Sequence, residues 1–399
     1  MSHTTYDYIV IGKGLMGAAA ARHLSAYSQS VALIGPDEPA DRATHQGVFG
    51  SHYDEGRITR ILDPERIWAL LAQRSIARYR DLEQRSGIAF YHEVGHLAVG
   101  PEPQGAEDYV ACLQAVGQEL GVVYETYAAA ALAERFPFLM FPPGSVAMYQ
   151  PHTAGHLSPR LQVRAQVAVA CQQGTHVIPA IVHRVRQVDG YVEVQTETGG
   201  SYQAGHVLVA TGGFSNTKHL LPRRLETAVF ARTIVLFELD NADVIRLREM
   251  PSIIHKPKEP SERCYILPPI QYADGKYYLK IGGETHDPTL QSLEALTAWF
   301  RSPGRAAAAD ALRQRLLSIV PDVRPLSIHT DTCVTTHTPT GNLYIDTLPG
   351  GRVGIVTGGN GSAAKSADEI GRVGALMLLH NAWTYDLDAH HFRARFVEA

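Results

Sequence analysis

The polar segment at residues 51–60 concentrates side chains that could bind an anion beside a reaction site. It reads Ser51-His52-Tyr53-Asp54-Glu55-Gly56-Arg57-Ile58-Thr59-Arg60. An arginine presents a planar fork that can bind a carboxylate through two hydrogen bonds, whereas a lysine acts as a point charge. Because a solvated surface loop is the simplest interpretation of such a charged run, its role must be decided from other parts of the chain.

Lys280 is a second residue whose surroundings are unusual for its chemistry. It lies in the apolar run Tyr277-Tyr278-Leu279-Lys280-Ile281-Gly282. A lysine in such a run either extends its ammonium group to solvent or is buried for a purpose. The residues of the run leave both alternatives open.

A glycine loop at residues 12–17 predicts a site for a dinucleotide. The sequence Gly12-Lys13-Gly14-Leu15-Met16-Gly17 fits the G-x-G-x-x-G pattern and lies between an apolar strand at 6–11 and a helix at 18–24. Glycines allow a tight turn and a close approach of the backbone to a diphosphate, which then meets free N–H groups at the start of the helix. The alternative is a helix that packs closely on a strand without a ligand. The usual acidic ribose ligand is absent at Gly35, so we expect Asp37 to take this role, although it could equally be a solvated acid.

Two further glycine segments follow apolar strands. Gly359-Asn360-Gly361-Ser362-Ala363-Ala364-Lys365-Ser366 resembles a phosphate-binding P-loop, but Ala364 occupies the position that requires glycine, and no acidic strand for Mg²⁺ is evident. We therefore exclude a nucleoside triphosphatase and interpret the segment as a turn that leads into a helix N-terminus. The strand at 207–210 and Thr211-Gly212-Gly213 could pass close to a dinucleotide or form only a strand and a turn.

Composition limits the remaining classes of function. The chain has 399 residues and a formal net charge of −4, which argues against a protein that coats nucleic acid. The four cysteines are far apart, without a CxxC pair, and no HExxH motif is present, so we expect neither disulfides nor a metal. We interpret Cys112 and Cys171 as core residues. The chain shows no signal-peptide pattern or membrane span, and we expect a cytoplasmic protein.

The ordered motifs together resemble the D-amino-acid-oxidase-type family of FAD-dependent oxidoreductases. Within that family the similarity is greatest to monomeric sarcosine oxidase and N-methyltryptophan oxidase. The most specific matches are the run Arg57-Ile58-Thr59-Arg60 and the segment from Cys333 to Asp346. The resemblance spans nearly the whole chain and implies an α/β fold (α+β overall), with a Rossmann-type FAD-binding domain and an interleaved antiparallel-sheet substrate domain. We expect the first domain to comprise residues 1–88, 151–224 and 326–399, and the second 89–150 and 225–325.

The resemblance also implies roles for individual residues. Cys333 would carry FAD through a thioether bond, although a buried structural cysteine is the common alternative. Arg60 and Lys365 would bind the substrate carboxylate, Arg57 would lie near the flavin, Tyr265 would form a pocket wall, and Lys280 would assist the reaction with oxygen. The expected cofactor contacts are Gly12, Gly14, Leu15, Met16, Gly17, Asp37, Ser51, Arg57, Thr211, Gly212, Cys333, Gly358, Gly359, Asn360, Gly361 and Lys365. The expected catalytic residues are Lys280, Arg57 and Tyr265, and the expected substrate contacts are Arg60, Lys365, Tyr53 and Glu284.

Three departures from the family pattern alter the expected pocket. Glu284 stands where sarcosine-active members have a histidine, Tyr53 replaces another histidine, and Gly56 replaces a threonine. Sarcosine itself is therefore doubtful as the substrate. A carboxylate at position 284 could favour a cyclic imino acid or an additional cationic group on the substrate.

The resemblance thus predicts an FAD-dependent oxidase of a small secondary amine or an N-methyl or cyclic amino acid. Hydride transfer to the flavin would give an imine, and O₂ would be reduced to H₂O₂. The alternatives are a flavin-dependent dehydrogenase of an amino or hydroxy acid with another electron acceptor, a non-catalytic nucleotide-binding module, and an NAD-dependent reductase. We expect a monomer, with neither nucleic acid nor membrane as a partner.

Overall fold

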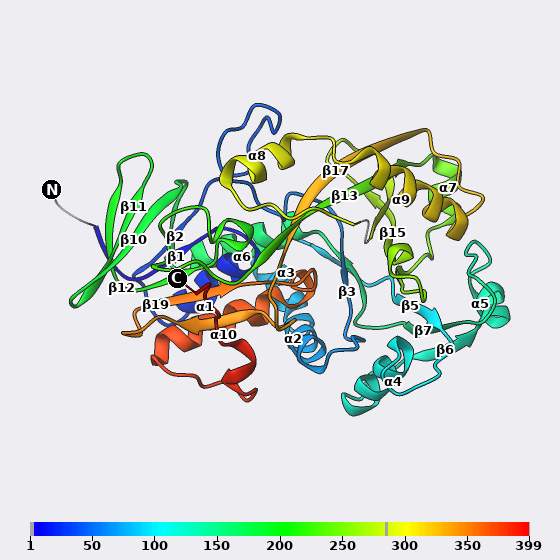
Figure 1. Cartoon of the computed structure of the whole chain (residues 1–399), viewed down its shortest axis with the longest axis horizontal. Helices are drawn as coiled ribbons and strands as arrows, with labels where there is room; N and C mark the ends of the chain where they lie inside the picture. The colour runs from blue at the N-terminus through cyan, green and yellow to red at the C-terminus, as the bar shows by residue number, and fades with distance from the viewer. Residues whose placement is uncertain (1–3, 284–285, 399) are drawn as a thin grey trace.

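The computed structural model describes residues 4–283 and 286–398 and contains two large sheets (Figure 1). The first sheet includes the strand order β10-β11-β12-β1-β2-β9, and β19 pairs with β12 and β18. Its strands are β1 (Thr4–Ile11), β2 (Val31–Ile34), β9 (His176–Ile178), β10 (Val182–Val188), β11 (Tyr191–Thr196), β12 (Ser201–Val209), β18 (Tyr344–Thr347) and β19 (Val353–Thr357). The β9, β2, β1, β12 and β19 strands run parallel.

The parallel strands are apolar and buried where both faces of this sheet are covered, as in β2, in β19 and in the carboxyl halves of β1 and β12. Val10, Leu33 and Leu208 share a core with helices α1 (Leu15–Ser25) and α10 (Ala367–His380). The alternate positions of the same strands pack on the other face with Val192 and Val194 of the β10–β11 hairpin. Helix α6 (Pro159–Gln172) packs against α1. The strand and the helix expected on either side of the glycine loop are present as β1 and α1, and the loop lies at the carboxyl end of β1.

The second sheet has the order β17-β13-β16-β15-β14-β5-β7-β6, and its strand pairs are antiparallel except for β14 with β5. Its strands are β5 (His96–Pro101), β6 (Glu125–Ala128), β7 (Ser145–Gln150), β13 (Ala228–Glu238), β14 (Ser252–His255), β15 (Cys264–Gln271), β16 (Tyr277–Gly283) and β17 (Ser327–His337). Helix α9 (Ala306–Ile319) covers β13 and β16, and α5 (Ala129–Arg135) packs on β6 and β7. Other helices in this region are α4 (Tyr109–Glu119), α7 (Asn241–Arg246) and α8 (Leu293–Arg301).

A small sheet of β3 (Arg57–Thr59), β8 (Gly155–Leu157) and β4 (Tyr91–His92) joins segments from distant parts of the sequence. After β3 the chain forms two consecutive helices, α2 (Arg66–Ile76) and α3 (Tyr79–Ser86). Gly87 ends α3 in the left-handed conformation, with φ of 70°, as its position after the helix predicts. Glu65 occupies the position before α2, and Asp63 Oδ1 accepts from Glu65 N at 3.1 Å, while Asp63 Oδ2 contacts two basic residues described below.

The mixed α/β architecture confirms the predicted fold class.

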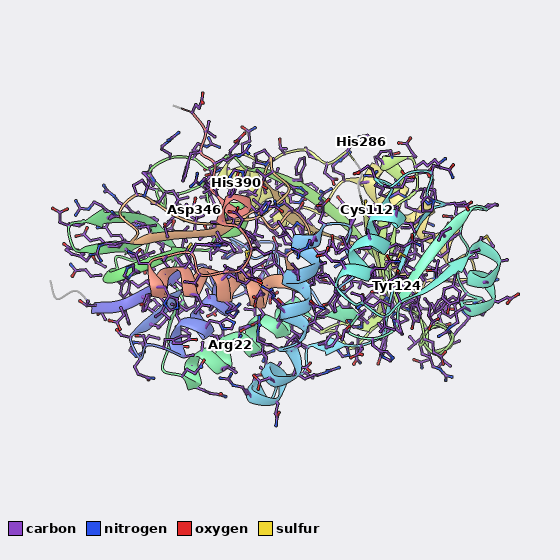
Figure 2. All side chains as sticks on the ribbon, turned by 90° about the horizontal axis from the view of Figure 1, so that it is seen from below. Arg22, Cys112, Tyr124, His286, Asp346 and His390 are labelled. Carbon is purple, nitrogen blue, oxygen red and sulfur yellow. The ribbon has the colours of Figure 1, made fainter. Side chains whose placement is uncertain are left out.

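Figure 2 shows Arg22 of α1 in one half of the molecule and Cys112 and Tyr124 in the other. The interpretation of Cys171 as a core residue is wrong, since its position on α6 is exposed, and Cys112 is only half-buried. The domain division stays a proposal, and the pairing of β17 with β13 would move its last boundary from residue 326 to a position after β17. No helix among the described residues is long and apolar enough to cross a membrane.

Candidate active site

A cavity of about 510 Å³ collects most of the residues singled out in the sequence. It extends from the β1–α1 loop along the end of β12 to the facing surface of the second sheet. The predicted residues that line it are Gly12, Gly14, Leu15, Met16, Ser51, Tyr53, Arg57, Arg60, Thr211, Gly212, Tyr265, Cys333, Gly358, Gly359, Asn360, Gly361 and Lys365. Gly17, Asp37 and Lys280 lie outside the lining, and Glu284 lies outside the described residues.

The glycine loop has the geometry that a diphosphate requires. Gly12 has φ of +108°, and a Cβ atom on Gly17 would lie 1.9 Å from the carbonyl oxygen of Gly12, so both positions exclude side chains. A Cβ atom on Gly14 would meet nothing closer than His52 Nδ1 at 3.9 Å, which leaves the cavity side open. Helix α1 begins after Gly14 without an acidic residue in its first turn and without a side-chain cap. Its first N–H groups are therefore available to an anion.

The second glycine turn forms another part of the cavity wall. Gly358, Asn360 and Gly361 all have positive φ values, and the Asn360 side chain accepts from Thr338 N at 2.9 Å and donates to Gly358 O at 2.7 Å. These bonds fix the turn. The turn leads into one 3₁₀ turn, η3 (Ala364–Ser366), before α10 begins.

The N-terminus of α10 is less positive than the sequence indicated. Its first turn contains the buried acids Asp368 and Glu369, which pair with Arg22, Arg78 and Arg372. The charges at this helix end are therefore those of the whole ion-pair network and not of the helix N-terminus alone.

The register of the second sheet explains why Cys333 and Tyr265 face the same cavity. Cys333 is opposite Arg232 on β13, Ile234 is opposite Gly282 on β16, and Gly282 is opposite Tyr265 on β15. Side chains two residues apart on a strand share a face, so these positions lie on one side of the sheet. Cys333 is half-buried, and its carbonyl oxygen accepts from Trp299 Nε1 at 3.0 Å. Burial raises the pKa of Tyr265 to about 12, so its hydroxyl group is neutral in the wall.

Arg60 and Lys365 lie together, but a carboxylate lies between them. Asp63 Oδ2 is 2.9 Å from Lys365 Nζ and 3.1 Å from Arg60 Nη2. All three side chains are buried, and Lys365 Nζ also donates to Trp68 O at 3.3 Å. Sequence reasoning missed Asp63, for which the signal was an acidic residue three positions after Arg60.

The protonation of this cluster follows from its burial. Burial lowers the pKa of Lys365 to about 8, although the adjacent carboxylate of Asp63 acts in the opposite direction. Burial alone would raise the pKa of Asp63, but the charges of Lys365 and Arg60 outweigh it and hold the pKa below its usual value. At neutral pH the cluster thus carries one net positive charge, which a bound carboxylate would neutralise.

Lys280 is fully buried, as one of its two sequence interpretations required, but its ammonium group is already paired. Lys280 Nζ contacts the carboxylate of Asp54 and donates to Gly56 O at 2.8 Å. It also lies 5.7 Å from the centre of the Tyr265 ring. Burial lowers its pKa well below the usual value and Arg57 lowers it further, whereas the contact with Asp54 favours the charged form. Asp54, which also contacts Arg57, was not identified from the sequence.

Asp37 lies at the surface near the glycine loop. Its side chain is 76% exposed and pairs with Lys13. The cavity wall instead contains His52, Arg232, Lys256 and Arg263, four side chains that sequence reasoning missed. Desolvation, with the charges of Arg160 and Arg57, lowers the pKa of His52 to about 3, so this imidazole is neutral.

The wall fits an extended dinucleotide bound next to a small anion. A helix N-terminus without acids lies at one end, glycines from two turns leave space along the middle, and Cys333 and the Arg60–Lys365 pair lie beyond. These are the features that FAD and an acidic substrate would require.

Comparisons with known proteins agree with this arrangement. The family model described as FAD dependent oxidoreductase (DAO) matches residues 7–377. The N-methyl-L-tryptophan oxidase of Yersinia pestis (strain Pestoides F) is 26% identical over 396 residues, which cover 98% of this chain and 99% of that protein. Among solved structures, NikD, described as an unusual amino acid oxidase essential for nikkomycin biosynthesis, superposes with a TM-score of 0.79 at 21% identity and covers 99% of both chains. L-proline dehydrogenase from P. horikoshii has a TM-score of 0.75 at 16% identity and covers 98% of this chain and 97% of that one.

The structural likenesses show the fold, and the family model extends over nearly all of the chain, from β1 to α10. This confirms the family expected from the glycine loop and from the segments around Arg57 and Cys333. The chain therefore belongs to the DAO family of FAD-dependent oxidoreductases.

Proposed function

We propose that this enzyme is an oxidase of a small secondary amine, or of an N-methyl or cyclic amino acid, that carries a carboxylate. The observation that carries the proposal is the buried cluster of Arg60, Lys365 and Asp63 in the cavity wall. Two cations that share one carboxylate keep a net positive charge, which is costly to bury and is relieved by a second anion. The oxidase activity of the N-methyl-L-tryptophan oxidase relatives supports the same class of reaction.

The residues that would contact FAD have distinct roles in this proposal. The N–H groups at the start of α1 would bind the diphosphate, Asp37 is retained as the candidate for the ribose, and Cys333 would hold the flavin through a thioether bond. Ser51, Arg57, Thr211 and the Gly358–Gly361 turn contact the remaining length of the cofactor. When bound, FAD accepts the hydride equivalent that leaves the substrate C–H bond.

The basic cluster also controls how the substrate binds. Arg60 offers two donors to the carboxylate and Lys365 offers a third, which together fix its orientation. The same positive charges disfavour an ammonium group nearby, so the amine binds as its free base. Tyr265 and Tyr53 form an apolar part of the cavity wall that contacts the carbon atoms of the substrate. No separate general base is needed, and the imine product is hydrolysed by water after it leaves the cavity.

The electron acceptor in our proposal is O₂, and Lys280 stabilises the negative charge that oxygen acquires on reduction. A second candidate is a dehydrogenase that passes electrons to another acceptor. It is favoured by one observation: Asp54 already pairs with Lys280, which reduces the positive charge available to oxygen. The molar yield of H₂O₂ per imine formed separates the two candidates, since a yield near one supports the oxidase and a yield near zero supports the dehydrogenase.

Anaerobic bleaching of the flavin by a panel of amines tests the proposed reaction. N-methyl and cyclic amino acids are expected to bleach it, whereas their decarboxylated counterparts are not. Equal bleaching by the decarboxylated amines would exclude the role of the Arg60–Lys365 cluster. A colourless purified protein would exclude a flavoenzyme altogether.

Acid precipitation tests the attachment through Cys333. The yellow colour is expected to precipitate with the wild-type protein and to stay in solution with Cys333→Ser, while Cys264→Ser serves as a control. Colour that precipitates with Cys333→Ser would place the bond elsewhere. A monomeric state and a cytoplasmic location also remain proposals, which light scattering and cell fractionation would test.

A further inference from the structure

Lys256 and Arg263 form a second basic region of the cavity wall, apart from the Arg60–Lys365 cluster. In the β14–β15 pair, Ile254 is opposite Tyr265 and His255 is opposite Cys264. Continuing this antiparallel register by one residue brings Lys256 opposite Arg263. Arg263 is two residues from Tyr265 and therefore shares its face, which is the face that lines the cavity.

The wall as a whole is strongly basic. Its described lining contains eight lysine and arginine side chains and no aspartate or glutamate. At least six of the eight pair with carboxylates that lie outside the lining. These pairs are Lys13 with Asp37, Arg57 with Asp54, Lys218 with Glu197, Arg232 with Asp287, and Arg60 and Lys365 with Asp63.

Arg263 differs from these six. Within the part of the chain that the structure describes, it makes no ion pair, and its buried Nε atom has no hydrogen-bond partner. The nearby acid Glu259 is exposed; hydrogen bonds from Ser261 lower its pKa most and the charge of Arg263 also lowers it, but Glu259 forms no ion pair with Arg263. A guanidinium group that is partly buried without an anion is unfavourable unless a ligand supplies the anion.

Tyr109 connects the two basic regions. Lys256 Nζ lies 4.7 Å from the centre of the Tyr109 ring. Tyr109 is also close enough to Arg60 and Asp63 for their charges to act on its hydroxyl group, whose pKa burial raises. Lys256 and Arg263 therefore extend the carboxylate site of Arg60 rather than forming a remote surface patch.

We propose that Arg263, with Lys256, is a second anion subsite, and that the substrate is an amine that carries two carboxylates. One carboxylate binds Arg60 and Lys365, and the other accepts two hydrogen bonds from the planar guanidinium group of Arg263. The inference rests on the proposed function, because it names the substrate class of the same site. A substrate with two carboxylates differs from the expectation, based on Glu284, that the substrate carries an additional cationic group.

Dead-end ligands test the subsite without turnover. Propionate, succinate and 3-phosphonopropionate are titrated into the holoenzyme, and each Kd is measured from the perturbation of the flavin absorbance. Succinate is expected to bind about tenfold or more tightly than propionate, because a charge-assisted pair contributes about 1.5 kcal/mol or more. Tighter binding of the phosphonate than of succinate would assign the subsite to phosphonate or phosphate groups and overturn the dicarboxylate assignment.

Substitutions locate the effect. Arg263→Gln is expected to remove most of the advantage of succinate while the Kd of propionate is unchanged, and Arg263→Lys is expected to retain part of it. Lys258→Gln, which removes the same charge from an exposed position nearby, is the control and is expected to have no effect. Equal binding of succinate and propionate by the wild type, or equal weakening of both by Arg263→Gln in a variant that melts like the wild type, would overturn the inference.

Anaerobic reduction by amines separates the two proposals. N-methylaspartate is expected to bleach the flavin at lower concentrations than N-methylalanine. If N-methylalanine is equally effective, the subsite inference fails and the proposed function stands. If no amine bleaches the flavin but succinate still binds through Arg263, the proposed function fails and the anion subsite stands.

Discussion

The charge of Lys365 is expected to make carboxylate binding depend on pH in the physiological range. Burial places its pKa at about 8, so its charged fraction falls from about nine-tenths at pH 7 to about one-tenth at pH 9. A group whose pKa is lowered on folding is charged below the folded value and neutral above it, and only the charged form pairs with an anion. If binding requires that form, the Kd of a carboxylate rises about tenfold between pH 7 and pH 9.

The assay should use a carboxylate without an amine, because an amine substrate loses its own proton over the same range and would mask the effect. Propionate is titrated from pH 6.5 to 9.5, and its Kd is read from the flavin absorbance. Lys365→Met is expected to bind weakly with no rise in this range, and Lys365→Arg, which stays charged, is expected to bind with a nearly constant Kd. A wild-type Kd that does not change with pH, or a tenfold rise that persists in Lys365→Met, would refute the reasoning.

Three further predictions concern stability and the loading of the cofactor. Gly17→Ala places a Cβ atom 1.9 Å from a backbone carbonyl oxygen, so we expect the free energy of unfolding to fall by about 1–3 kcal/mol and the FAD content, measured as the A450/A280 ratio, to fall as well. Gly105→Ala is the control, since its Cβ atom would meet nothing within 4 Å and the A450/A280 ratio should be unchanged. Asp63→Asn leaves two buried cations without their anion; urea unfolding should show a loss of about 3–5 kcal/mol that added propionate partly restores, and no change would contradict the pairing. Tyr79→Phe removes a 2.6 Å hydrogen bond to the backbone carbonyl of Lys365, which should cost about 1 kcal/mol in the same assay, and an unchanged midpoint would show that the bond contributes little.

Local geometry explains which parts of the site could be predicted from the sequence. The glycine loop was predictable because its glycines act on their own neighbours: Gly12 adopts a positive φ, and Gly17 contacts the carbonyl of Gly12. The strand before it was predictable because β1 is apolar over a short run. The shared location of Arg60 and Lys365 followed only from the family resemblance, since 304 positions separate them in the sequence and η3 brings them together.

The ion pairs of the site could not be predicted from patterns in the sequence. Asp63 looks like the start of α2, and in the fold its carboxylate binds Lys365, which arrives from the other end of the chain. Asp54 reads as part of a solvated loop, and in the fold it reaches Lys280 on β16. In both cases one carboxylate oxygen accepts from a neighbouring backbone N–H group while the other pairs with a distant cation, and the local sequence pattern gives no sign of that second partner.

The same pairing rule makes the charges in the cavity wall informative about the ligand. A protein that buries a cation before its ligand arrives must stabilise it, and most of the basic side chains in this wall have a carboxylate of their own. Positive charge that exceeds these carboxylates is then the charge that a ligand has to neutralise. The Arg60 cluster has one such excess charge and, among the described residues, Arg263 has another in the wall of the same cavity. A monocarboxylate amine would leave Arg263 unsatisfied in the occupied site, whereas a dicarboxylate would satisfy both, and it is this difference that the titration with succinate and propionate measures.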